Sequence, residues 1–560
     1  MLRDLTAHPL FKPTTREPAR RRWYEPETIP KILFYSGSGL LLLLILLVPA
    51  YILVRLLGAG PSMWVELWQP HAFSILANTL GLALAVTVAS VLLGVPIAWL
   101  TTCSDLPYRR LWFVLTTLPL VIPSYIAAFL YISLLGGGGP VRQFLAANFS
   151  LTSLPSIYGF GGAFLVLTFV SFPYVTLTTR ASLKRMDPAL VEAARSLGLS
   201  PRQAFSRITL PYLRPAIVAG ALLTTLYVIR DFGAVTMLQY STFTRVIYNR
   251  YLAYRLDSAA GFALMLIALA MALLYLEQRS RGKAVYSRLS TGAARRAKLS
   301  RLGTWKAPAL AFVSAVVLVT LLLPAYGLGF WLVRGLRNEW MVQLPGAEQS
   351  TMQVVAGLVQ PAISTISASS LGAIAAAMLA LPVAFLIVRR PGRLTRLLER
   401  TTYAAFAIPG IVVALAYVFF GARYGGSLYQ TLPMMLAAYV VLFIPQAVGA
   451  QRASFLQLSP SLEEAGRGLG HGAAVIFRRI TIPLVRPGIL SGVALVFLTC
   501  MKELPATLIL SPLGFESLAA QIWSSIGEAF FARAALPAML LLLLSSLPLA
   551  IITLKDTEST

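Results

Sequence analysis

The sequence predicts an all-α integral membrane protein of about twelve transmembrane helices, arranged as two parallel six-helix repeats. Composition is the first reason, because 57% of the 560 residues are hydrophobic and only 12% are charged, whereas soluble proteins carry about 25% charged residues. The mean hydropathy of +0.74 over this length requires lipid as the solvent. These values exclude a soluble enzyme and a disordered or fibrous protein. The second reason is an internal repeat, described below.

Twelve apolar runs have the length of about 20 residues that a membrane-crossing helix needs. The first run is too long for the core of a cleaved signal peptide and follows a basic segment, so we expect it to remain as a span. The predicted spans are 32–54, 73–102, 111–135, 157–179, 213–234, 258–276, 307–333, 362–388, 401–421, 429–451, 486–508 and 534–554.

The net charge of +26 is distributed unevenly between the two sides of the predicted topology. With the basic run Arg20–Arg22 in the cytoplasm, the inner segments carry +23 and the outer segments +3. The positive-inside rule therefore places both termini in the cytoplasm. The basic segment 281–306 then becomes a cytoplasmic linker near anionic lipid, and the charge needs no nucleic-acid partner to explain it.

Residues 180–217 and 452–489 align without a gap, and 18 of the 38 positions are identical. Six spans lie in each half, so both halves enter the membrane in the same direction and are related by a pseudo-two-fold axis along the membrane normal. This arrangement favours a transporter with its pathway on the axis. The predicted regions are an N-terminal extension 1–31, a first half 32–280 with the repeated loop 180–215, the linker 281–306, and a second half 307–560 with the repeated loop 452–487.

Each repeated loop carries the start and stop signals of a short helix on the cytoplasmic side. Asp187 and Ser459 are good N-caps, and each precedes a proline at the first helical position. Gly198 and Gly470 come where a helix ends with a left-handed residue. A second short helix follows in each loop and is expected to end at a proline; these prolines are Pro211 and Pro483.

These loops resemble the cytoplasmic signature of permease subunits of binding-protein-dependent ABC importers, of the type I permease fold. The pattern is Glu-Ala-Ala, a glycine six positions after the glutamate, and then Ile-x-Leu-Pro; the second copy departs from it at Gly466 and Ile482. The resemblance implies that the first short helix of each loop docks into a groove of an ATP-hydrolysing subunit. The implied coupling residues are Glu192, Ala193, Ala194, Gly198, Glu464, Ala465, Gly466 and Gly470.

The chain lacks the phosphate-binding pattern G-x-x-x-x-G-K-[ST], so the ATPase must be another chain. The resemblance implies two copies of that ATPase, which bind ATP and magnesium, and an external or periplasmic substrate-binding protein. We expect no cofactor on this chain and no catalytic residue, because Cys103 and Cys500 are isolated and only three histidines are present. The predicted location is the bacterial inner membrane.

Two charged pairs, Arg230-Asp231 and Lys502-Glu503, occupy equivalent positions in otherwise apolar segments and are candidates for the substrate pathway. The stretch from Lys502 to Leu508 resembles the fused permeases of ferric-iron importers. Carboxylates suit a hard cation, so Asp231 and Glu503 are candidate transient metal ligands. Equally, the pairs could be structural, or their cations could steer an anion. Permeases for thiamine, polyamine or phosphonate, a secondary transporter and a membrane enzyme are the alternative functions.

Overall fold

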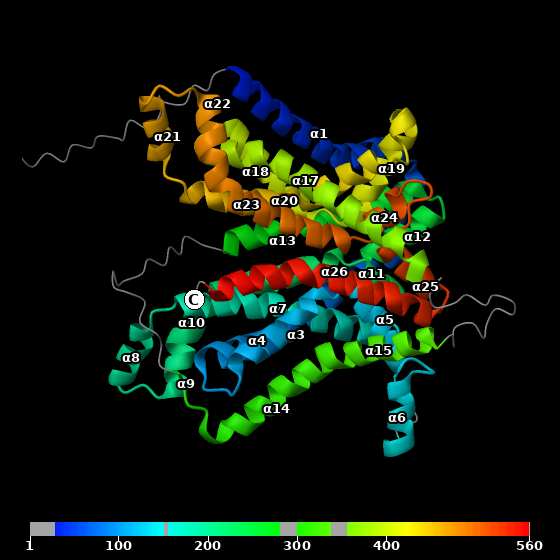
Figure 1. Cartoon of the computed structure of the whole chain (residues 1–560). Coiled ribbons are helices and arrows are strands. Elements are labelled where there is room, and N and C mark those ends of the chain that lie inside the picture. The colour runs from blue at the N-terminus through cyan, green and yellow to red at the C-terminus, as the bar shows by residue number, and fades with distance from the viewer. Residues whose placement is uncertain (1–27, 151–154, 281–298, 338–354, 559–560) are drawn as a thin grey trace, which may run out of the picture.

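The structure, a computed structural model, describes residues 28–150, 155–280, 299–337 and 355–558 (Figure 1). Within these ranges every regular element is a helix, and a single parallel bridge between Ser104 and Ser300 is the β-type pairing. Helices pair their own backbone groups, which is what a chain surrounded by hydrocarbon requires. The predicted fold class is confirmed. The run Arg20–Arg22 and most of the linker 281–306 lie outside the described residues.

The first half of the chain contains long helices joined by shorter ones. In order they are α1 (Thr28–Gly58), α2 (Pro61–Leu67), α3 (Pro70–Cys103), α4 (Arg109–Thr117), η2 (Leu118–Val121), α5 (Ser124–Leu135), α6 (Pro140–Phe149), α7 (Phe160–Arg185), α8 (Pro188–Ser196), α9 (Pro201–Ala204), η3 (Phe205–Thr209), α10 (Leu210–Arg230), α11 (Gly233–Met237), α12 (Phe243–Leu252) and α13 (Leu256–Ser280).

The second half repeats the order of the long helices, with the short turn η8 in the place of α6. Its elements are η4 (Gly303–Trp305), α14 (Lys306–Val317), η5 (Leu318–Leu322), α15 (Leu323–Leu336), α17 (Val359–Arg389), α18 (Arg393–Ala404), η7 (Ala405–Ala407), α19 (Gly410–Tyr424), η8 (Gly426–Leu428), α20 (Leu432–Gln457), α21 (Pro460–Gly468), α22 (Ala473–Ile476), η9 (Phe477–Thr481), α23 (Ile482–Met501), α24 (Pro505–Leu510), α25 (Leu518–Gly527) and α26 (Phe531–Glu558).

Ten helices of the described chain are long and apolar enough to cross a membrane, or eleven if one bent pair counts as a span. This is fewer than the twelve spans predicted. The bent pair covers the predicted span 401–421, which turns by 108° between Arg393–Ala407 and Gly410–Tyr424. The last predicted span, 534–554, lies in α26, where the apolar helix with described side chains runs only from Phe531 to Ser546.

The predicted span 111–135 is also wrong as a single helix, since it divides into α4, η2 and α5. The break falls at Ile122, before Pro123, and its equivalent falls at Ile408, before Pro409. Both isoleucines are extended, with ψ of 116° and 122°. A residue that precedes proline is driven out of the helical region by contact with the proline ring. The same local rule therefore breaks the third span of each half.

The prolines expected to end the second short helix do not end it. The chain runs from α9 through the π-helical turn η3 directly into α10, and Pro211 lies in the first turn of α10. Pro483 lies in the first turn of α23 in the same way, after the π-helical turn η9. A π-turn is wider than an α-turn by one residue, which leaves room for a residue that has no N–H.

The first helix of each half packs against the other half. The Tyr417 hydroxyl of α19 donates a hydrogen bond of 3.2 Å to the Leu44 carbonyl of α1. At the equivalent position, the Tyr131 hydroxyl of α5 donates a hydrogen bond of 2.6 Å to the Val319 carbonyl of η5. The rings of Tyr51 and Phe419 also meet, with centroids 5.4 Å apart. The two halves are thus joined by exchanged helices as well as by the linker.

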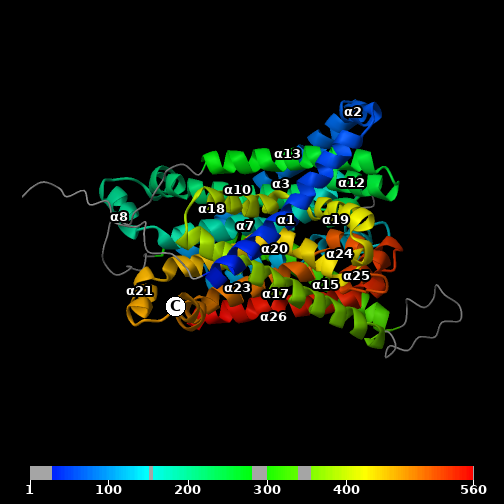
Figure 2. The ribbon, with the colours of Figure 1, turned by 90° about the horizontal axis from the view of Figure 1, so that it is seen from above.

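The two short helices of the repeated loops lie at the same end of the molecule. Figure 1 and Figure 2 both place α8 and α21 at one end, with α12 and α25 at the other. We call the first the coupling end and the second the opposite end. The C-terminal end of α26 also lies at the coupling end (Figure 1).

Candidate functional site

The two predicted coupling helices, α8 and α21, begin as the sequence indicates. The Asp187 carboxylate accepts a hydrogen bond of 3.0 Å from the Ala189 amide, and the Ser459 hydroxyl accepts one of 3.4 Å from the Ser461 amide. These side chains satisfy amides that have no partner within the helix. Each helix therefore has a fixed starting point immediately after a transmembrane helix.

Both coupling helices end in left-handed glycines, as predicted. The φ angles of Gly198 and Gly470 are +86° and +79°. The amide after each glycine reaches back over the last turn of the helix, from Leu199 to the Ala194 carbonyl at 3.2 Å and from His471 to the Gly466 carbonyl at 3.2 Å. This is the hydrogen-bond pattern of a Schellman cap.

The coupling helices present one face to the protein and one to the surroundings. Ala194 and Gly466 are buried, whereas Glu192 and Glu464 are exposed, as are Ala193 and Ala465. At the tip of each helix a leucine is also exposed, Leu197 by 85% and Leu469 by 78%. A single exposed leucine is ordinary on a protein surface, but its recurrence at the same place in both halves distinguishes this position.

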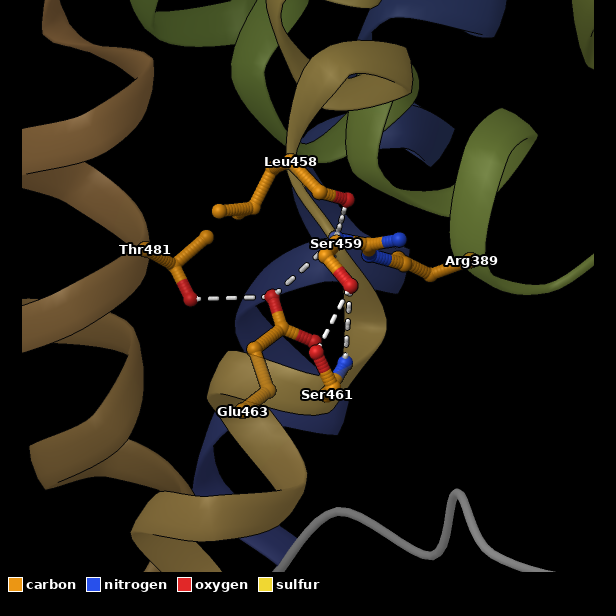
Figure 3. Close-up of polar contacts among 6 residues, drawn as sticks. All are labelled: Arg389, Leu458, Ser459, Ser461, Glu463 and Thr481. Carbon is orange, nitrogen blue, oxygen red and sulfur yellow. Dashed lines mark hydrogen bonds and ion pairs between the residues drawn. The ribbon is translucent and has the colours of Figure 1, made fainter.

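The second coupling helix has an attachment that sequence reasoning missed. Glu463 of α21 is buried, and its carboxylate lies 3.5 Å from the guanidinium of Arg389, the last residue of α17 (Figure 3). The Thr481 hydroxyl donates a hydrogen bond of 3.1 Å to the same carboxylate, and Arg389 donates one of 3.1 Å to the Leu458 carbonyl. The equivalent residues of the first half are Val191 and Cys103, which bear no charge.

Burial raises the pKa of the Glu463 carboxyl above its ordinary value, while the Thr481 hydrogen bond and the charge of Arg467 lower it. The direction follows from the cost of removing a carboxylate from water. A comparison of the two repeats could have identified the attachment. The positions of Cys103 and Val191 in the first half are occupied in the second half by the oppositely charged Arg389 and Glu463.

At the opposite end, the helix α10 ends at Arg230, so the predicted span 213–234 is wrong at this boundary. The Arg230 guanidinium donates a hydrogen bond to the Phe406 carbonyl of the second half. Lys502 donates one of 3.2 Å to the Leu120 carbonyl of the first half. Leu120 and Phe406 are themselves equivalent positions, in η2 and η7. The two cations therefore cross the interface between the halves in a reciprocal way.

The two carboxylates cap short helices within their own halves. Asp231 is buried, and its side chain accepts hydrogen bonds from the amides of Ala234 and Val235 at 3.0 and 3.3 Å. The Glu503 side chain is partly buried and accepts one of 3.2 Å from the Ala506 amide. Glu503 is also close enough to Arg230 to interact with its charge.

The described residues contain no group of three or more histidine, cysteine, aspartate or glutamate side chains that could hold a metal ion. Asp231 and Glu503 therefore do not belong to a preformed metal centre in the described chain. Their assignment as transient ligands stays a prediction.

Three aromatic rings pack together at the interface between the halves, next to Asp231. The Phe232 ring lies 4.9 Å from that of Tyr248 and 5.3 Å from that of Trp523. Tyr248 lies in α12 and Trp523 in α25, and these ten-residue helices are equivalent elements of the two halves. This contact was not predicted, because the loops before α12 and α25 differ in length and hide the equivalence of the two helices.

A family model described as the inner membrane component of binding-protein-dependent transport systems matches this chain twice, at residues 104–277 and 368–555. The two matches fall one in each predicted half. Each covers the coupling helix and the charged pair of its half.

Individual relatives extend this similarity over most of the chain. The Fe(3+)-transport system permease protein FbpB 2 of Haemophilus influenzae is 32% identical over 505 residues, 89% of this chain and 93% of the relative. The putative ferric transport system permease protein FbpB 1 of the same organism is 25% identical over 500 residues, 84% of this chain and 77% of the relative. The sulfate transport system permease protein CysT of Salmonella typhimurium is 28% identical over 258 residues, 44% of this chain and 91% of the relative.

Proposed function

The chain belongs to the inner membrane components of binding-protein-dependent transport systems, and from this premise we propose that it is the permease of an ABC importer for ferric iron. In this proposal an external binding protein delivers the iron, and hydrolysis of ATP by a separate subunit drives its passage into the cell. The chain is a transport subunit and catalyses no reaction itself.

The occurrence of two capped, exposed helices at the same end of the molecule carries the proposal. Each of them, α8 and α21, offers an acidic residue, a small residue and an exposed leucine to a partner. Two such helices in pseudo-two-fold arrangement suit two copies of an ATPase subunit, one on each. The proposed coupling residues are those predicted from the sequence, between Glu192 and Gly198 and between Glu464 and Gly470.

Iron is proposed as the cargo because two relatives that match both halves are named for ferric transport. The sulfate relative matches only 44% of this chain. The test reconstitutes the chain with its ATPase and binding protein in vesicles and measures uptake of ferric iron, thiamine, polyamine, phosphonate and sulfate. ATP-dependent uptake of iron alone supports the proposal. Uptake of another solute without iron contradicts the assignment of cargo and leaves the permease class intact.

The proposed orientation places the coupling end and both termini in the cytoplasm, on the charge asymmetry of the sequence. A cysteine introduced at residue 290 should react in intact cells only with a reagent that crosses the membrane. Labelling of that cysteine by an impermeant external reagent would contradict the orientation.

Asp231 and Glu503 are proposed to contact the iron as it passes, since they are carboxylates at equivalent positions beside the interface between the halves. Asp231→Asn and Glu503→Gln together should lower iron uptake about ten-fold or more, because an amide binds a hard cation far more weakly than a carboxylate. Thermal stability and stimulation of the ATPase are measured in parallel. Unchanged uptake in a stable, ATPase-stimulating variant would remove both carboxylates from the path.

A further inference from the structure

The two coupling helices are attached to the membrane helices in different ways. The second, α21, has a buried ion pair, in which the side chains of Arg389 and Glu463 are 7% and 3% exposed. In the first, α8, none of the described side chains forms an ion pair, and the residue equivalent to Glu463 is Val191. The two coupling helices thus expose similar surfaces but are attached to the membrane helices by different contacts.

The contacts of Arg389 and Glu463 join α21 to three transmembrane helices at once. Arg389 ends α17, and besides its ion pair with Glu463 it donates a hydrogen bond to the Leu458 carbonyl, immediately after α20. Thr481, the hydroxyl partner of Glu463, lies in η9 at the start of α23. Figure 3 shows the carboxylate between the guanidinium on one side and the hydroxyl on the other. Any rotation of α21 relative to α17 must therefore separate the two charges or break these hydrogen bonds.

A buried ion pair gives little net stability, because both charges lose their hydration, and its best-attested value is to fix one arrangement among several. The first half reaches a similar fold without this pair, so folding alone does not require it. We propose that Arg389 and Glu463 are positioning residues that attach the second coupling helix rigidly to the membrane helices. The first coupling helix lacks this attachment and is free to tilt, so motion of the ATPase is transmitted unequally to the two halves. This unequal transmission rests on the proposed function.

The first test measures hydrogen exchange on the full-length chain alone, in lipid nanodiscs. The amides of α21 should exchange at least about ten-fold more slowly than those of α8, because opening α21 requires the ion pair to break. Glu463→Gln should remove most of this difference while leaving exchange in α8 unchanged. Equal exchange in the two wild-type helices, or no effect of the substitution, would overturn the proposal.

The second test transfers the first half's residues to the second. Arg389→Cys with Glu463→Val replaces the pair by the residues found at Cys103 and Val191. The double variant should keep a melting temperature near that of the wild type, since no buried charge is left alone. Its α21 amides should nevertheless exchange as quickly as those of α8. Slow exchange in this variant would show that other contacts hold the helix and would overturn the proposal.

The third measurement uses the complex with the ATPase. The double variant should transport several-fold less iron for each ATP hydrolysed, with an unchanged KM for ATP. The matched control is Glu399→Gln, which breaks the partly exposed ion pair of 2.7 Å between Glu399 and Arg452 without touching α21. It should leave the ratio unchanged. An unchanged ratio in the double variant contradicts unequal transmission. Failure of the ATPase to bind the wild-type chain would instead refute the proposed function, and the exchange result would still test the attachment.

Discussion

Ala194 and Gly466 occupy equivalent positions on the buried faces of the two coupling helices. A methyl group on Gly466 would lie 3.0 Å from the Cδ1 atom of Ile480 and 3.2 Å from the Cγ1 atom of Ile476. In the first half the residue equivalent to Ile476 is Ala204. One half therefore fills the space with two alanines and the other with a glycine and an isoleucine. This exchange of volume explains why the second copy departs from Glu-Ala-Ala.

The left-handed glycines lead to a prediction at the same scale. No atom lies within 4 Å of a methyl group added to Gly198 or Gly470, so a substitution there is disfavoured by φ alone. Gly198→Val with Gly470→Val should lower stability by about 1–2 kcal/mol at each site and displace the exposed leucines at the tips. Iron uptake should fall while the protein still inserts. Wild-type uptake in this variant would contradict a docking role for the two helices.

The local features were predictable from the sequence because their causes are local. Asp187 and Gly198 lie next to the groups that they cap, so the spacing alone indicates their roles. The partner of Arg230 was not predictable, since it lies in the other half of the chain. The partner of Glu463 lies in a distant helix, and only a comparison of the two repeats indicates it. The prediction that Pro211 ends a helix was wrong for another reason. A π-turn, which the sequence does not indicate, precedes Pro211 and lets the helix continue through it.

At the scale of elements, the broken third spans of the two halves face each other across the interface between the halves. Their 3₁₀ turns, η2 and η7, present the carbonyls that Lys502 and Arg230 reach. A hydrogen bond from a charged group contributes about 1.5–3 kcal/mol. The two cations thus favour the arrangement in which the halves are in contact at the opposite end, and they link the ends of α10 and α23 to the turns of the other half.

Loss of the hydrogen bond between Lys502 and Leu120 should favour separation of the two halves at the opposite end. Lys502→Met is expected to raise ATP hydrolysis in the absence of the binding protein, by about ten-fold for a contribution of this size. Arg423→Met is the control, because Arg423 is an exposed cation at the end of α19 that makes no described contact across the interface. Basal hydrolysis that stays at the wild-type rate would argue that the crossing bonds do not restrain the halves.

The end of the linker is a second element with a defined attachment. The Asp105 carboxylate accepts a hydrogen bond of 2.9 Å from the Leu302 amide and lies 3.3 Å from the Lys306 ammonium. The Leu302 amide is the main reason that the pKa of Asp105 lies below its ordinary value of 3.8, and Lys306 lowers it further. A carboxyl with a lowered pKa stabilises the folded state above its ordinary pKa and loses this effect as the pH falls through the lowered value.

Asp105→Asn should therefore reduce the melting temperature at pH 7. The difference from the wild type should shrink as the pH falls from about 3.8 to the lowered pKa of the folded protein, below which the wild-type carboxyl is protonated in both states. Thermal unfolding of both proteins over a series of pH values measures this. A difference that stays constant down to pH 2 would show that the charge of Asp105 is not the cause.

At the scale of the whole molecule, the exchanged first helices hold the halves together independently of the linker. Tyr131 and Tyr417 tie η5 and α1 to the opposite halves by equivalent hydrogen bonds. The sequence predicted two parallel halves, because a repeat fixes their number and direction. It did not predict the exchange, since an apolar helix carries no mark of which half it will pack against.

Cutting the chain between Ser280 and Leu299 should leave an assembled protein. When residues 1–280 and 299–560 are produced together, we expect them to copurify and to transport iron at close to the wild-type rate. Removal of residues 1–60 from the first fragment should abolish copurification or reduce it several-fold, because α1 is lost from the surface of α19. Copurification that does not depend on α1 would contradict a joining role for the exchanged helix.

The exchange of helices also bears on how a chain of this kind can arise. Two identical subunits that swap their first helices already place the start of one subunit on the body of the other. The attachment at Asp105 shows the result, because the residues before α14 rest on the first half from which the linker departs. A duplicated gene joined end to end would need only a short connection over one body, with no crossing of the interface. After such a fusion each copy can diverge separately, and Arg389 with Glu463 is the kind of change that a homodimer could not confine to one side.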